Sequence, residues 1–75
     1  MHIFIFDMKN KQDILNEIRQ TDLCEVLYVA DQLAKKYKGS LQAKKYFQLC
    51  NNENTSAFEL YNISADLLLL NIRNK

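Results

Sequence analysis

Apolar residues recur at three- and four-residue steps between positions 23 and 37, and this spacing constrains the fold more than any other feature. Asp22 precedes the first of them, and its carboxylate can cap a helix while Glu25, three residues later, bonds back to the backbone. Lysines near the far end complement the helix dipole, and Gly39 is expected to supply a left-handed cap. The spacing places seven side chains on one helical face: Leu23, Val26, Leu27, Ala30, Leu33, Ala34 and Tyr37.

Two further helices are expected after this segment. Ser40 can cap a second helix that ends at the polar turn 51–54, so the two helices are expected to form a tight antiparallel hairpin. Ser56 and Glu59 have capping-box spacing and open a final helix. The expected inward side chains are Ala43, Phe47 and Cys50, flanked by Tyr46 and Leu49, in the second helix, and Ala57, Leu60, Tyr61, Leu67 and Leu68 in the last.

The last helix is apolar nearly all round in its second half. Its run Leu67–Leu70 therefore faces either a deep core or a second chain, because a small monomer can scarcely cover every side of it. A weaker helix over residues 11–20 is expected earlier in the chain, capped by Asn10 and burying Ile14, Leu15 and Ile18.

The chain has 75 residues, no proline and one glycine, which favours one domain (1–75) of helices joined by short turns. The expected fold class is mainly α: a small bundle of three to four short helices with an N-terminal β-strand, assembled as a dimer. The β-prone run Ile3–Phe6 is the strand, and it needs a partner for its backbone. Two alternatives stay open: these residues form the first turn of a helix, or Ile63–Leu69 is the partner strand within one chain.

A two-fold dimer would pair or pack Ile3–Phe6 across its axis, since two-fold dimers are the commonest closed assemblies. The predicted dimer-interface residues are Ile3, Phe4, Ile5, Phe6, Leu68 and Leu69.

Several classes of protein are not expected from this composition. Cys24 and Cys50 are too few for a disulfide framework and are interpreted as buried free thiols. His2 is the only histidine, so neither a structural zinc site nor a nucleophile–histidine pair is expected. One glycine rules out a glycine-rich phosphate loop, and the spacing of Asp13 and Glu17 is typical of a solvated helix face. We expect no enzyme activity, no cofactor and no metal.

No unbroken apolar run in the chain exceeds five residues, whereas a bilayer span needs about 20. No secretory segment is recognisable, so a cytoplasmic protein without a membrane span is expected.

Charge is segregated along the chain although the net charge is only +1. Acidic residues dominate positions 13–31, and a cluster of lysines without any acidic residue follows. The cluster is either a solvated hairpin tip or a contact for an acidic protein surface. The second interpretation is the functional one. Its residues, the predicted partner-binding site, are Lys35, Lys36, Lys38, Lys44 and Lys45.

Direct nucleic-acid contact is possible but not favoured. The lysines interleave with tyrosines, a mixture that can bind single strands, but helical tyrosines more often bury their rings. Ala34 to Gly39 is one residue too long for a helix-turn-helix motif, and Lys44 stands where that motif needs a buried aliphatic residue.

Two resemblances accompany these patterns. The spacing Leu33-Ala34-x-x-Tyr37 followed by Ala43-x-x-x-Phe47-x-x-Cys50 resembles a tetratricopeptide helical hairpin. The stretch from Ala30 to Tyr61, with Gly39, Ala43, Phe47, Asn54 and Phe58, is similar to the AraC negative regulator family of small helical virulence modulators. That resemblance implies a dimer that binds transcription activators of the AraC type or nucleoid proteins of the H-NS type.

The leading hypothesis is therefore a non-catalytic protein–protein interaction module, a small dimeric regulator that modulates transcription by binding a transcription factor or nucleoid protein. The alternatives are a phage- or plasmid-encoded inhibitor or immunity protein, and a single-stranded nucleic-acid binder.

Overall fold

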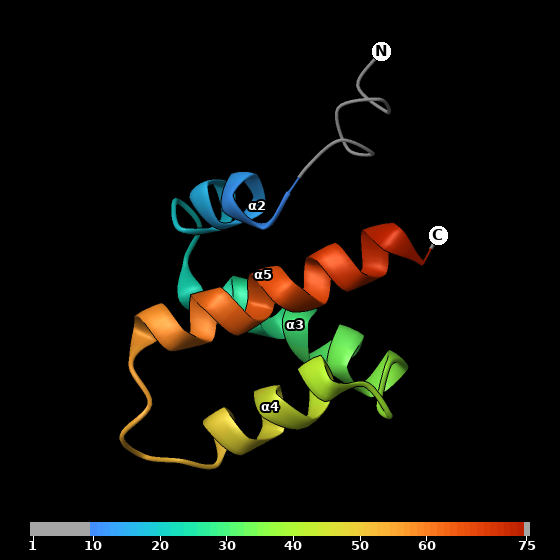
Figure 1. Ribbon diagram of the computed structural model, residues 1–75. Helices are drawn as coiled ribbons and strands as arrows, with labels where there is room; N and C mark the ends of the chain where they lie inside the picture. The colour runs from blue at the N-terminus through green and yellow to red at the C-terminus, as the bar shows by residue number, and fades with distance from the viewer. Residues whose placement is uncertain (1–9, 75) are drawn as a thin grey trace.

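A computed structural model of the chain describes residues 10–74, and its four helices in this range form a small bundle (Figure 1). No strand occurs between residues 10 and 74, which confirms the predicted mainly helical fold. The predicted strand Ile3–Phe6 lies outside the described residues. The helices are α2 (Lys11–Ile18), α3 (Leu23–Lys36), α4 (Leu41–Cys50) and α5 (Ala57–Arg73).

The longest helix, α5, packs against each of the other three, and α3 packs against α4. Figure 1 shows α2 above α5 and α4 below it, and both figures show α3 and α4 running in opposite directions. The predicted antiparallel hairpin is therefore present, and α5 is the element on which the bundle is assembled.

Three of the predicted helix starts are fixed by side-chain caps. The Asp13 N–H donates to Asn10 Oδ1 at 2.9 Å, and the Ala43 N–H donates to Ser40 Oγ at 3.1 Å. At α5 the capping box is complete, because the Ser56 N–H donates to Glu59 Oε1 at 3.1 Å while Ser56 caps the Glu59 N–H. Such caps satisfy backbone N–H groups that the helix itself leaves unpaired.

The larger part of the core lies between α3, α4 and α5. Ala34 and Ala43 are completely buried, and these small side chains let the helix backbones approach closely. Ile63 and Leu67 of α5 fill the space between the two other helices. The buried members of this cluster are Ala30, Leu33, Ala34, Ala43, Tyr46, Ile63 and Leu67.

A second cluster joins α2 to the other side of α5. Ile14 and Leu15 pack on Ala65, and Lys11 Nζ lies 3.0 Å from Asp66 Oδ1 at its edge. Leu68 packs against both clusters. The apolar residues around α5 are covered in part within one chain, because helices lie against its axis from several directions; Leu67 is buried and Leu68–Leu70 are half-buried.

Two of the predicted helix caps are wrong. Asp22 occupies the N-cap position of α3, but its carboxylate makes no cap hydrogen bond. Gly39 does not have a positive φ, so it is not a left-handed cap; the helix ends instead at Tyr37, whose N–H donates to the Leu33 carbonyl at 2.9 Å. The turn into α4 therefore imposes no backbone requirement for glycine.

The predicted burial is also wrong at three positions. Both Cys24 and Cys50 are free thiols, as expected, but they are exposed. On α4 the side chain that enters the core is Tyr46 rather than Cys50, and on α5 Ala57 is exposed at the first turn. The alternative of a strand over Ile63–Leu69 is excluded, because these residues are helical within α5.

Candidate protein-binding surfaces

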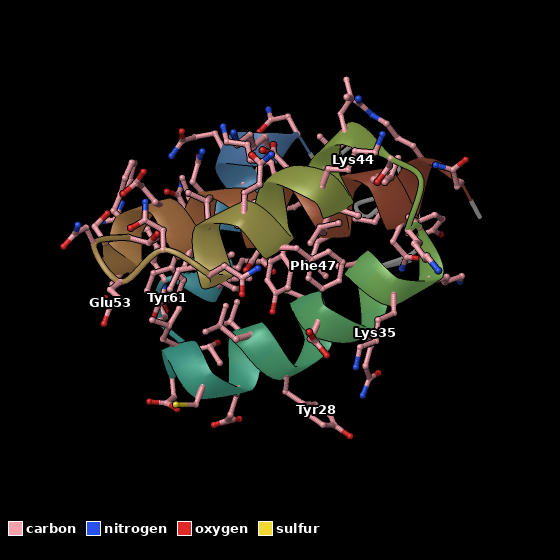
Figure 2. All side chains as sticks on the ribbon, turned by 90° about the horizontal axis from the view of Figure 1, so that it is seen from below. Tyr28, Lys35, Lys44, Phe47, Glu53 and Tyr61 are labelled. Atoms are coloured by element: carbon pink, nitrogen blue, oxygen red, sulfur yellow. The ribbon has the colours of Figure 1, made fainter. Side chains whose placement is uncertain are left out.

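The predicted lysine cluster lies where α3 passes into α4, and all five of its side chains are exposed. Figure 2 shows the labelled Lys35 and Lys44 on different helices toward this end of the hairpin. We call this surface the basic tip and define it as Lys35, Lys36, Lys38, Lys44, Lys45 and Leu41.

Only part of the positive charge at the basic tip is engaged within the chain. Lys35 Nζ lies 2.9 Å from Asp31 Oδ2 in an exposed pair one helical turn apart, and Lys36 Nζ lies 5.4 Å from the centre of the Tyr37 ring. The other three lysines have no ion pair within residues 10–74. Because exposed ion pairs contribute about 0–1 kcal/mol at most, the fold does not depend on these charges.

Leu41 is the most exposed large apolar residue in the described part of the chain, with 81% of its surface accessible. It begins α4, and Lys44 and Lys45 follow it by three and four residues, a spacing that puts all three on neighbouring positions of the helix surface. The basic tip therefore presents an apolar side chain beside cations.

The tyrosines that interleave with the lysines in sequence are mostly committed to the interior. Tyr37 donates its hydroxyl to Asn71 Oδ1 at 2.8 Å, and Tyr61 donates to the Thr21 carbonyl at 2.8 Å. Tyr46 donates to the Leu27 carbonyl at 3.4 Å and is 3% exposed. Burial raises the pKa of the Tyr46 hydroxyl well above its usual range, with smaller contributions from Cys50 and Asp31, so it stays a neutral donor.

Tyr28 is the exception, with 69% of its surface accessible. In Figure 2 it projects from the side of α3 away from α4, whereas Phe47 lies between the two helices. Sequence reasoning missed this side of α3. The available signal was two large apolar residues, Tyr28 and Val29, next to each other outside the buried stripe of that helix.

An open, mostly apolar groove of about 540 Å³ adjoins Tyr28 and Val29. It lies where the end of α2 and the first half of α3 meet the middle of α5. Among residues 10–74, Glu25 is the one charged residue that lines it, and Leu68, a predicted interface residue, lines it from α5. The lining residues of this α3 groove are Ile18, Thr21, Cys24, Glu25, Val26, Tyr28, Val29 and Leu68.

The predicted site residues thus fall on different parts of the molecule. The lysines gather at the basic tip, whereas Leu68 reaches the α3 groove and Leu69 packs toward α2 in the second cluster. The groove uses the first half of α3 and the tip includes its last turn, and the 14 residues of that helix span about 20 Å. Ile3, Phe4, Ile5 and Phe6 lie outside the described residues.

Neither surface gathers groups suited to metal binding. Within residues 10–74 no three His, Cys, Asp or Glu side chains lie close enough together to hold a metal ion. No helix in this range is long and apolar enough to cross a membrane.

Comparisons with protein families, with curated proteins and with solved structures find no match for this chain.

Proposed function

We propose that the chain is a non-catalytic protein-binding module that modulates transcription by occupying a transcription factor or nucleoid protein. The observation that carries the protein-binding part is the basic tip, where Lys44 and Lys45, which have no ion pair within residues 10–74, follow the exposed Leu41 on α4. The transcriptional part rests on the resemblance of residues 30–61 to the AraC negative regulator family.

The chemistry of the tip defines the partner that fits it. Exposed lysines steer an acidic surface into contact, and their charges add specificity more than affinity. An apolar side chain that becomes desolvated at the centre of a contact contributes more of the binding free energy. The partner surface is therefore acidic, with an apolar pocket that receives Leu41.

The tyrosines favour this proposal over single-stranded nucleic-acid binding. Stacking needs exposed rings beside the cations. Tyr37, Tyr46 and Tyr61 use their hydroxyls in bonds to other parts of the chain, and the exposed Tyr28 borders the α3 groove. An inhibitor or immunity protein would use the same tip. The identity of the bound partner therefore distinguishes an inhibitor from a regulator of transcription.

Affinity capture from a lysate of the source organism tests the proposal. Wild-type protein is compared with Lys44→Glu/Lys45→Glu and with Arg19→Glu, which removes an exposed cation at the C-cap of α2, outside the basic tip. We expect a transcription factor or nucleoid protein that is retained by wild type and Arg19→Glu and is lost with the double variant. Retention by all three proteins would contradict the role of the tip, and a partner outside transcription would contradict the regulatory function.

A further inference from the structure

We propose that the α3 groove binds an amphipathic helix of another protein, a helix that carries large apolar side chains on one face and lysine or arginine beside them. This inference goes beyond the proposed function and uses different residues, because the basic tip takes no part in it.

The groove has the size and lining of a binding cleft. Its volume of about 540 Å³ lies in the range of roughly 300–1,000 Å³ that is usual for ligand-binding clefts. Tyr28 and Val29 line it and leave 69% and 43% of their surfaces accessible. Apolar surface is stabilised by removal from water, so a partner that covers these two side chains with apolar groups gains binding free energy.

The charge at the start of α3 selects a basic partner. Asp22 and Glu25 are three residues apart there, and both are exposed. Neither forms an ion pair within residues 10–74, and the Asp22 carboxylate makes no cap hydrogen bond. Residues 17–25 contain three acidic residues against a single basic one, Arg19. A lysine or arginine on the partner therefore meets a complementary negative charge.

The spacing of these groups on α3 defines the spacing that the partner needs. Glu25 precedes Tyr28 by three residues and Val29 by four, so its side chain lies one helical turn from both. A matching partner places its apolar side chains and its cations one turn apart as well. That spacing is the pattern of an amphipathic helix.

The backbone of the groove favours a helix over an extended segment. Val26, Tyr28, Val29 and Leu68 lie inside helices, where the backbone N–H and C=O groups pair within the helix. The Thr21 carbonyl accepts the Tyr61 hydroxyl at 2.8 Å. An extended segment needs backbone partners that these residues do not offer, whereas a helix satisfies its own backbone groups.

Fluorescence anisotropy with a designed peptide tests the proposal. The probe is a fluorescein-labelled peptide of leucine and lysine, patterned as an amphipathic helix and about 18 residues long so that it can form a helix in solution. A control peptide has the same composition with its leucines spread around the helix. We expect wild type to bind the probe with a micromolar dissociation constant and the control peptide at least tenfold more weakly.

Four full-length variants locate the binding site. Val29→Ser removes apolar surface from the groove and Glu25→Gln removes its charge, whereas Phe58→Ser and Glu53→Gln make the same changes at exposed residues outside the lining. Each groove variant should raise the dissociation constant of the probe at least fivefold, and the two controls should leave it unchanged. Circular dichroism checks that every variant keeps its helices; if Val29→Ser does not, Tyr28→Ser replaces it.

The same measurements detect other occupants of the groove. If Phe4→Asp in the full-length chain tightens binding of the probe, the groove is covered by the chain's own first residues. If wild type is a dimer that Val29→Ser dissociates on sedimentation equilibrium, the occupant is a second copy. Either result, absence of binding, or equal dissociation constants for the groove and control variants would overturn the proposal.

Discussion

At the residue scale, Ala34 and Ala43 set the distance between helices. Both are completely buried where α3, α4 and α5 meet, and a larger side chain there has no space to enter. We predict that Ala43→Leu lowers the free energy of unfolding by about 1–3 kcal/mol because it overpacks the core. Urea denaturation measures the change. Ala57→Leu is the control, since Ala57 is exposed, and a similar loss in both variants would contradict this packing.

Gly39 gives a prediction opposite to the one its sequence position suggests. Its φ is not positive, and a Cβ added there meets no atom within 4 Å. Gly39→Ala should therefore keep or raise the free energy of unfolding, by up to about 1 kcal/mol, because alanine restricts the unfolded chain. Thermal unfolding provides the measurement. A clear loss of stability would show that the turn needs the left-handed conformation after all.

Tyr46 predicts a stability change in alkaline solution. Its pKa is raised by burial in the folded chain, from 10.0 for an unperturbed tyrosine, so the folded state holds this proton more tightly than the unfolded state. The resulting stabilisation is complete below pH 10 and is lost as the pH rises above it. Between pH 9 and pH 11 the melting temperature of wild type should fall further than that of Tyr46→Phe. Equal losses in the two proteins would contradict a buried, neutral Tyr46.

At the element scale, α5 holds the bundle together because it contacts each of the three other helices in the described part of the chain. Leu67 lies between α3 and α4 with no accessible surface, whereas Leu70 is half-buried. Leu67→Ala should lower the free energy of unfolding by about 2–5 kcal/mol, and Leu70→Ala by clearly less. Urea unfolding of both variants tests this order. A larger loss for Leu70→Ala would mean that the core side of α5 is wrongly assigned.

The elements also show what could be predicted from sequence. The caps at Asn10, Ser40 and Ser56 depend on residues three positions apart, so local sequence is enough to place the helix starts. The buried face of α5 could not be chosen in the same way. Its second half is apolar nearly all round. The sequence pattern predicts Leu67 on the inward side but does not include Ile63, and only the positions of α2, α3 and α4 decide that Ile63 points inward as well.

One of the two candidate surfaces could also be predicted from sequence, and the other could not. The basic tip could be predicted because its lysines are close in sequence and the turn between two helices keeps them close in space. The α3 groove could not, since Ile18, Val29 and Leu68 come from three helices and meet only after the bundle forms. The exposure of Cys24 and Cys50 was missed because free cysteine is usually buried.

At the scale of the whole molecule, α3 separates two surfaces of different chemistry. The basic tip includes its last turn and offers cations around one apolar residue, whereas the α3 groove borders its first half and is mostly apolar. We therefore expect substitutions of the exposed tip lysines to change partner binding without changing the helical circular dichroism of the protein.

The central claim is that the basic tip binds an acidic protein surface around Leu41, and one affinity measurement tests it most directly. The partner recovered by affinity capture is titrated against wild type, Leu41→Glu and Phe58→Glu by biolayer interferometry. Leu41 and Phe58 are both exposed apolar residues, but only Leu41 lies among the lysines. We predict at least tenfold weaker binding for Leu41→Glu and wild-type affinity for Phe58→Glu. Wild-type affinity for Leu41→Glu, or equal weakening by both substitutions, would contradict the claim.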